Sequence, residues 1–115
     1  MSEEKKVNIL ASCLGNAVGL VDMAGYADDS IVSKTILDKP VGTITFFAFD
    51  KGQKLSEHTA KYDAVVQVLD GRALFVIGDE QKEVSVGQLI IMPANVPHSV
   101  KAVEKFKMLL TMIRE

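Results

Sequence analysis

Residues 52–71, GQKLSEHTAKYDAVVQVLDG, contain two short β-prone runs that lie between glycines. The second run, AVVQVL, is rich in valine, which is typical of strands. A glycine at each end favours a chain reversal, because glycine adopts positive φ without steric cost. The segment therefore predicts two strands joined by a loop, and His58 is the only imidazole in it.

The same pattern continues through most of the chain after Gly15, where runs of Val, Ile, Thr and Phe alternate with Gly, Asp, Asn or Pro. Residues 4–14, EKKVNILASCL, allow one short helix, because apolar residues recur there at three-to-four spacing. Many short strands in one small chain are typical of a sandwich or a barrel. The predicted strands are 17–22, 31–37, 42–49, 53–59, 64–70, 72–77, 80–85, 88–92, 97–103 and 106–113.

Composition limits the classes of function. With 115 residues, 48% of them hydrophobic and 24% charged, the chain is expected to form one folded domain, residues 1–115. A formal charge of −2 without a long basic run argues against binding to nucleic acid. No apolar stretch approaches the roughly 20 residues that span a bilayer, so no membrane partner is expected.

The N-terminus and the single cysteine favour a cytoplasmic protein. The start, MSEEKKVNIL, lacks an apolar run long enough for a secretory signal. Cys13 has no partner in the chain for a disulfide.

Several predicted strands are apolar on both faces, as in ALFVI at 73–77, LIIM at 89–92 and FKMLLTMI at 106–113. Strands of this kind are covered on both sides. In a domain of this size a second subunit could supply the outer cover, so we expect a homodimer.

Two groups of residues follow each other along the chain at characteristic spacings. The first group is Gly52, His58 and Gly71, and the second is Gly87, Pro93 and His98. These spacings resemble the two motifs of the cupin superfamily, in its small single-domain conserved-barrel type. The resemblance implies an all-β, cupin-type double-stranded β-helix (jelly-roll) barrel, with its core at 42–113 and an N-terminal helix and strands at 1–41. Asn95 stands where the family has a turn glycine, so we expect Asn95 to have positive φ.

The resemblance also implies where metal ligands would lie. Metal-binding cupins have three histidines and a carboxylate or amide, and this chain keeps His58 and His98 but has Ala60 and Ala64 at the other positions. Asp63 could replace the missing carboxylate only if the chain there is a loop or a bulge. Zinc, manganese, iron or nickel are the candidate ions. Two imidazoles alone do not make a catalytic site, so we expect no tightly bound metal.

These observations favour a small-molecule-binding barrel with a degenerate metal site. In this hypothesis His58 and His98 orient a polar ligand group, and their pKa range would suit a small carboxylate or acid–base chemistry. The expected apolar wall of the pocket consists of Phe47, Phe49, Val66, Val68, Met92, Phe106 and Met108. Two alternatives stay open at this point: a metal-dependent enzyme of the dioxygenase or isomerase kind that uses His58, His98 and Asp63, and a structural or protein-partner module. The same barrel hosts many functions, so the fold alone does not choose among them.

Overall fold

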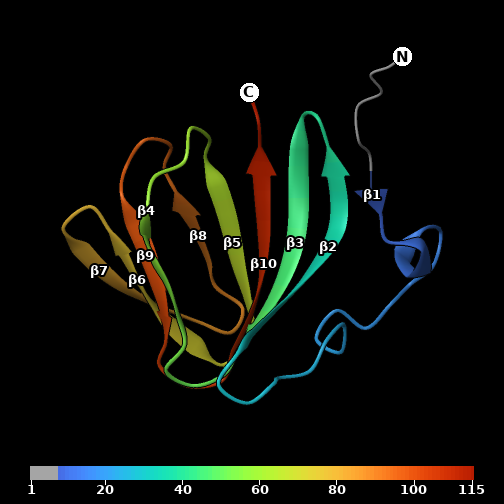
Figure 1. Cartoon of the computed structure of the whole chain (residues 1–115), viewed down its shortest axis with the longest axis horizontal. Coiled ribbons are helices and arrows are strands. Elements are labelled where there is room, and N and C mark those ends of the chain that lie inside the picture. The colour runs from blue at the N-terminus through green and yellow to red at the C-terminus, as the bar shows by residue number, and fades with distance from the viewer. Residues whose placement is uncertain (1–7) are drawn as a thin grey trace.

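The computed structural model describes residues 8–115 as two β-sheets packed face to face (Figure 1). One sheet has six strands in the order β1-β2-β3-β10-β5-β8, and the other has four in the order β4-β9-β6-β7. Neighbouring strands in both sheets are antiparallel, as expected for a jelly roll. The strands are β1 (Asn8–Ile9), β2 (Ile31–Lys39), β3 (Gly42–Phe49), β4 (Lys54–His58), β5 (Ala64–Asp70), β6 (Arg72–Ile77), β7 (Glu80–Ser85), β8 (Leu89–Met92), β9 (His98–Ala102) and β10 (Phe106–Ile113).

Most of the predicted strands are present, and the N-terminal predictions need two corrections. The segment 17–22 is not a strand but part of an irregular stretch. In place of the end of a helix at 4–14, the described part of that segment holds β1 and a 3₁₀ turn, η1 (Ala11–Cys13). Residues 4–7 lie outside the described residues. The helix fails because Asn8 and Ile9 pair with the edge of β2, and such a short helix is marginal without tertiary packing.

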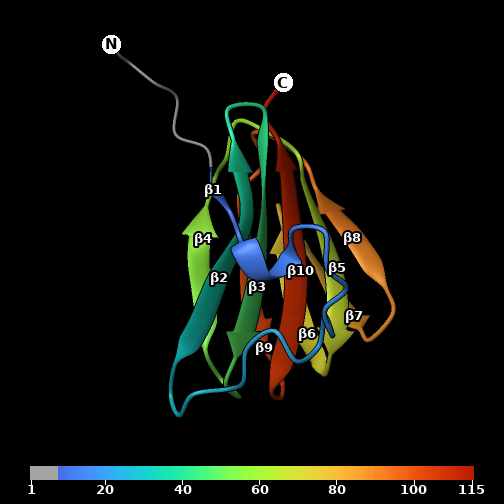
Figure 2. The same ribbon diagram turned by 90° about the vertical axis from the view of Figure 1, so that its right-hand side faces the viewer.

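The irregular stretch, residues 10–28, crosses the outer face of the six-stranded sheet, and we call it the N-terminal strap (Figure 2). Side chains hold it there. Lys107, only 7% exposed on β10, donates to the carbonyl of Val21 at 2.6 Å. The Tyr26 hydroxyl donates to the Asp70 carboxylate at 2.5 Å, at the end of β5. The strap lies over the outer face of the six-stranded sheet, so this chain itself supplies part of the cover that the doubly apolar strand β10 requires.

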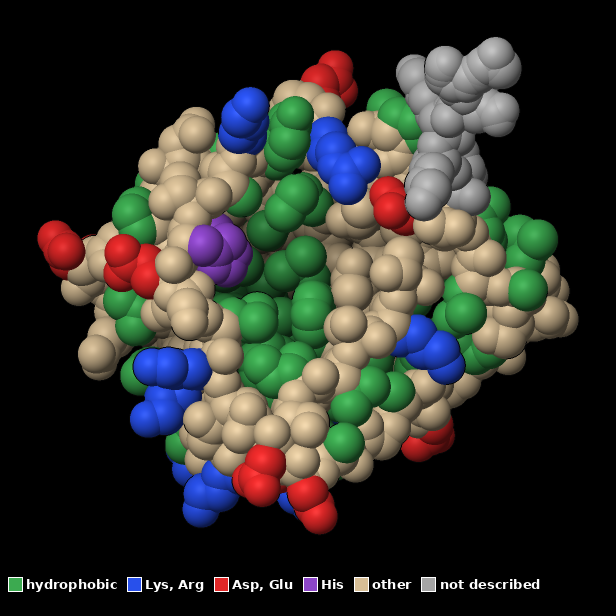
Figure 3. Space-filling view, viewed as in Figure 1, with side chains coloured by type: hydrophobic (Ala, Val, Ile, Leu, Met, Phe, Trp, Pro, Cys, Tyr) green, Lys and Arg blue, Asp and Glu red, His purple; other side chains and the backbone are tan. Residues whose placement is uncertain are grey.

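The two sheets meet closely at one end and splay apart at the other. The space-filling view shows a hollow lined by hydrophobic side chains, with histidine at its edge (Figure 3). β1 and β4 are edge strands of different sheets, and in the described part of the chain neither pairs with a strand of the other sheet, which is consistent with a barrel that is open on this side.

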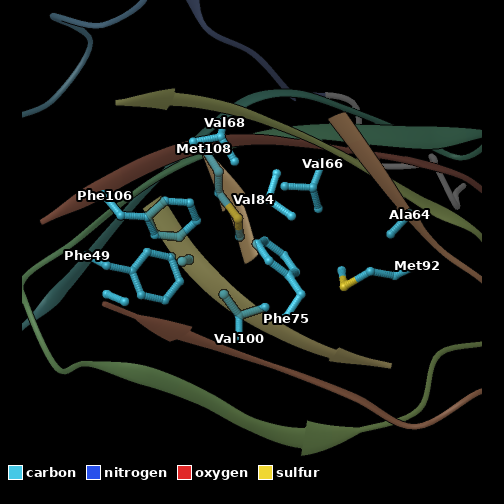
Figure 4. Close-up of a cluster of buried hydrophobic side chains, with 12 residues drawn as sticks. Phe49, Ala64, Val66, Val68, Phe75, Val84, Met92, Val100, Phe106 and Met108 are labelled. Carbon is cyan, nitrogen blue, oxygen red and sulfur yellow. The ribbon is translucent and has the colours of Figure 1, made fainter. Parts of the chain in front are cut away.

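The hydrophobic core lies between the sheets. Phe49, Phe75 and Phe106 are fully buried, and their rings pack at centroid distances of 5.0 and 6.2 Å (Figure 4). The cluster is completed by smaller residues from both sheets, Ala64, Val66, Val68, Ala73, Val84, Met92, Val100, Ala102 and Met108.

The turn between β5 and β6 depends on glycine. Gly71 has φ of +69°, and a Cβ there would lie 1.8 Å from the Lys105 carbonyl oxygen. No other residue fits without moving the backbone. Within residues 8–115 the structure has no helix of the length and apolar character that a membrane crossing needs.

Candidate functional site

An irregularity in β4 places His58 opposite His98. Leu55 lies opposite Val100 and His58 lies opposite His98, so three steps along β4 match two along β9. This is the geometry of a β-bulge, which changes the face on which the following side chain lies. In a regular strand Leu55 and His58 would lie on opposite faces. The bulge at Ser56 and Glu57 therefore places both on the inner face.

His98 is positioned by the corner at residues 93–97. Asn95 has φ of +66°, as its place in the motif predicts. Its backbone N–H donates to the carbonyl of Ala60 at 2.7 Å, and the N–H of Ala94 donates to the Asp63 carboxylate at 2.8 Å. The corner before β9 is thus tied to the loop after β4, and the two loops hold the histidines together.

The two imidazoles form a contacting pair. The Nε2 atoms of His58 and His98 lie 3.2 Å apart, and the ring planes are inclined at 70°. His98 is 3% exposed, whereas His58 is exposed to solvent. One imidazole is therefore part of the protein interior, and the other is accessible from outside.

Both Nδ1 atoms contact backbone carbonyls. His58 Nδ1 lies 2.9 Å from the Ser56 oxygen, and His98 Nδ1 lies 3.1 Å from the Val96 oxygen. A carbonyl only accepts hydrogen bonds, so both Nδ1 atoms are assigned as N–H donors. In the neutral rings both Nε2 atoms then carry lone pairs, and these lone pairs face each other.

Two facing lone pairs repel unless a proton or a donor group lies between them. Burial lowers the pKa of His98, and a charge on His58 lowers it further, while the hydrogen bond to Val96 acts in the opposite direction. His98 therefore favours the neutral form, and its Nε2 is an acceptor.

The pair supplies only part of a metal site. Two nitrogens 3.2 Å apart, each about 2.05 Å from an ion, would subtend about 100°, as neighbouring ligands do on zinc. The positions of the missing ligands hold Ala60 and Ala64. The Asp63 carboxylate accepts a backbone hydrogen bond instead, and the described residues hold no group of three His, Cys, Asp or Glu able to bind an ion. This donor set does not fit the three- or four-ligand metal centre that the resemblance implies.

Ala60 lies in the loop after β4, which ends at His58, so strand alternation does not place it on the same face as His58. Ala64, in contrast, is buried in the core at the start of β5. Its small side chain occupies part of the interior where a longer ligand side chain would project.

The predicted apolar wall divides into two groups. Phe47 is partly buried and packs against the core. The other six members are core side chains with no more than 3% exposure, namely Phe49, Val66, Val68, Met92, Phe106 and Met108. Sequence reasoning missed the partly buried inner residues Leu55, Ile77, Ile90, Leu110 and Met112. Apolar alternation marks an inward face but does not show how deeply each residue lies.

A family model for the cupin domain matches residues 45–114, more than half of the chain. The chain belongs to the cupin family. The match begins within β3 and runs past the end of β10, so it includes both histidines and both motifs. No match was found among curated proteins.

Solved cupin structures superpose well on this chain. A conserved protein of unknown function from Streptococcus pyogenes is 36% identical, with a TM-score of 0.84 over 87% of this chain and 88% of that one. A cupin 2 conserved barrel domain protein from Leptotrichia buccalis is 37% identical, with a TM-score of 0.78 over 81% of this chain and 45% of that one. A mutant salicylate 1,2-dioxygenase from Pseudoaminobacter salicylatoxidans is 16% identical, with a TM-score of 0.69 over 81% of this chain and 29% of that one. This last likeness is one of fold alone.

Proposed function

We propose that this cupin binds a small, mainly apolar molecule through one hydrogen-bond-donating group held by His58 and His98. The observation that carries the proposal is the 3.2 Å separation of two Nε2 atoms whose partner nitrogens are both bonded to carbonyls. A hydroxyl or an amide N–H would supply the hydrogen that the facing lone pairs lack. The preferred ligand group is thus a neutral donor rather than the carboxylate expected from the sequence.

The surroundings of the pair support an apolar ligand body. Ile77 lies opposite His98 on β6, and Leu55 precedes the bulge on β4. Across the barrel, Thr45 and Leu110 are paired on the inner face of the six-stranded sheet, and both are partly buried. Binding sites for small molecules commonly combine such apolar walls with a few polar groups that fix orientation.

A matched set of probes tests the proposal. 4-Methylphenol carries a hydroxyl donor, 4-methylanisole replaces it with a methyl ether, and 4-methylbenzoate presents an anion. We expect 4-methylphenol to bind on the order of tenfold more tightly than the ether, because one hydrogen bond to an otherwise unmatched acceptor is lost. The measurement is NMR titration, followed through the imidazole carbon-bound protons of His58 and His98.

The variant His58→Leu is the control. It keeps an apolar side chain at the rim and removes one of the two Nε2 acceptors, so the preference for the phenol over the ether should weaken. Equal binding of phenol and ether to the parent protein, or tightest binding of the benzoate, would reject the donor hypothesis. Stoichiometric, tight Zn²⁺ binding by the parent protein would reject it too, in favour of a metal-dependent cupin.

A further inference from the structure

The outer face of the four-stranded sheet carries an apolar strip. On β6, Ala73 and Phe75 are fully buried in the core, so the alternation of the strand directs Leu74 and Val76 outward. Both outward side chains are half-buried. The N-terminal strap lies over the other sheet (Figures 1 and 2). This sheet therefore presents apolar side chains on a face that the strap leaves uncovered.

Two lysines lie beside the strip. Lys101 on β9 is flanked by Leu74 on β6 and by Lys54 on β4, each directly opposite it. Because Val100 and Ala102 are buried, Lys101 lies on the outer face, and its cross-strand partner Lys54 shares that face. Both lysines are exposed. Like charges directly opposite each other destabilise a sheet, so an anion bound between the two ammonium groups would be favourable.

The acidic groups of this sheet do not neutralise the lysine pair. Glu83 on β7 contacts the Arg72 guanidinium at 2.6 Å, and Glu104 contacts the same guanidinium at 3.3 Å. Among residues 8–115, no carboxylate lies within ion-pair distance of either lysine. The positive charge of the pair is therefore available to a ligand.

A groove of about 300 Å³ joins the lysines to the apolar strip. Its lining includes both lysines, both outward side chains of β6, two serines and one acid, namely Lys54, Lys101, Leu74, Val76, Ser56, Ser99 and Glu57. An adjoining depression of about 380 Å³ shares Leu74 and Lys101 and adds Lys51. Glu57 lies toward the Val76 end, because β4 runs antiparallel to β9. The charges thus change from one carboxylate at that end to three ammonium groups at the other.

We propose that this groove binds an amphipathic anion, with a carboxylate or phosphate head group between Lys54 and Lys101 and a short apolar chain over Leu74 and Val76. The carboxylate of Glu57 repels the head group and so fixes the direction of the ligand. From residue 99 to residue 103 the groove and its adjoining depression extend about 13 Å, which suits a chain of a few carbons. The inference is independent of the proposed ligand site, because the imidazoles lie at the inner face of the same strands.

Matched probes test the groove in the full-length protein. Hexanoate has both a charged head group and a chain, methyl hexanoate keeps the chain without the charge, and acetate keeps the charge without the chain. At low ionic strength we expect hexanoate to bind at least about fivefold more tightly than either of the others. In about 0.5 M NaCl its advantage over the ester should fall below about twofold. The measurement is an NMR titration followed through the backbone amides of Leu74, Val76 and Lys101.

Lys101→Gln should weaken hexanoate binding at least about fivefold and bring it close to that of the ester. The melting temperature should not change, because Lys101 is exposed. Lys82→Gln is the matched control, since Lys82 is an exposed lysine of the same sheet that contacts Glu80 at 3.4 Å on β7. It should leave hexanoate binding within about twofold of the parent protein. Hexyl phosphate should bind as well, and the tighter of the two anions identifies the head group.

Several results would overturn the inference. Equal binding of hexanoate and methyl hexanoate would remove the role of the charge, and equal binding of hexanoate and acetate would remove the role of the chain. An equal loss in Lys101→Gln and Lys82→Gln would show a response to net charge alone. His58→Leu separates this groove from the barrel, because it should bind hexanoate as the parent protein does. Loss of binding in that variant would place the carboxylate at the imidazoles and overturn the assignment to the groove.

Discussion

His58 and His98 lie directly opposite each other on β4 and β9, with their Nε2 atoms 3.2 Å apart and each Nδ1 facing a backbone carbonyl. Two unlike devices create this relationship. A bulge turns His58 inward, and a left-handed residue, Asn95, sets the corner before His98. A change in either device should alter the pair without touching an imidazole.

The pH dependence of stability follows from His98. Its pKa in the folded protein is lowered, chiefly by burial, so the unfolded chain binds a proton more readily. Above pH 6.5 His98 is neutral in both states and does not reduce stability. The free energy of unfolding should fall as the pH drops from 6.5 through the lower pKa of His98 in the folded protein. Urea unfolding between pH 7.5 and 5 should show this slope in the parent protein and a shallower one in His98→Phe. Identical slopes would mean that His98 is not the group responsible.

Asn95 is expected to tolerate glycine and to reject a β-branched residue. Its φ of +66° is left-handed, so Asn95→Gly should be neutral or slightly stabilising, whereas Asn95→Val should cost about 1–2 kcal/mol of unfolding free energy. Urea denaturation of the three proteins measures this. Similar stability of all three would show that the corner rearranges freely.

A third imidazole should restore metal affinity. Ala60→His adds a donor in the loop after β4, two residues beyond His58, and we expect Zn²⁺ to bind at least about tenfold more tightly than to the parent protein. Calorimetry and the metal-dependent rise in melting temperature measure the gain. If the variant folds and binds no more tightly, residue 60 is directed away from the pair.

Ala64→Glu should behave differently from Ala60→His. Ala64 is 1% exposed in the core, so an added carboxylate without a metal would be buried and unpaired. We expect a loss of about 2–4 kcal/mol in metal-free protein, which added Zn²⁺ would partly restore only when Ala60→His is also present. Urea unfolding with and without Zn²⁺ distinguishes the cases. An undiminished stability would place the side chain in solvent.

The strap should loosen when its hydrogen bond to Asp70 is removed. Tyr26→Phe deletes the hydroxyl that donates to Asp70 and leaves that carboxylate without its partner, so we expect about 1–2 kcal/mol lower stability. Amide hydrogen exchange should also quicken within residues 19–28. Tyr62→Phe is the control, because within the described part of the chain the Tyr62 hydroxyl makes no such bond. Equal effects of the two substitutions would argue against the anchor.

Local pattern determined much of the fold. The strands 42–49, 64–70, 72–77, 80–85 and 106–113 were predicted with the bounds that the structure has, because alternation and turn residues act over a few neighbours. The motif spacing identified the cupin barrel, the left-handed Asn95 and the meeting of the two histidines. A glycine or proline at a turn has the same steric effect whichever distant segments pack around it, so these features can be predicted from the sequence.

Tertiary structure decided the rest, since it depended on contacts between distant segments. Residues 17–22 look like a strand, yet they cross a sheet whose strands already pair with one another, so no partner edge is available. The doubly apolar strand β10 required a cover, and the sequence could not show that the strap supplies part of it. The bulge at Ser56 and Glu57 is visible only in the register of β4 against β9, because alternation within one strand carries no information about an extra residue. The proton arrangement of the histidine pair likewise depended on the carbonyls of Ser56 and Val96, which only the folded backbone aims at the rings.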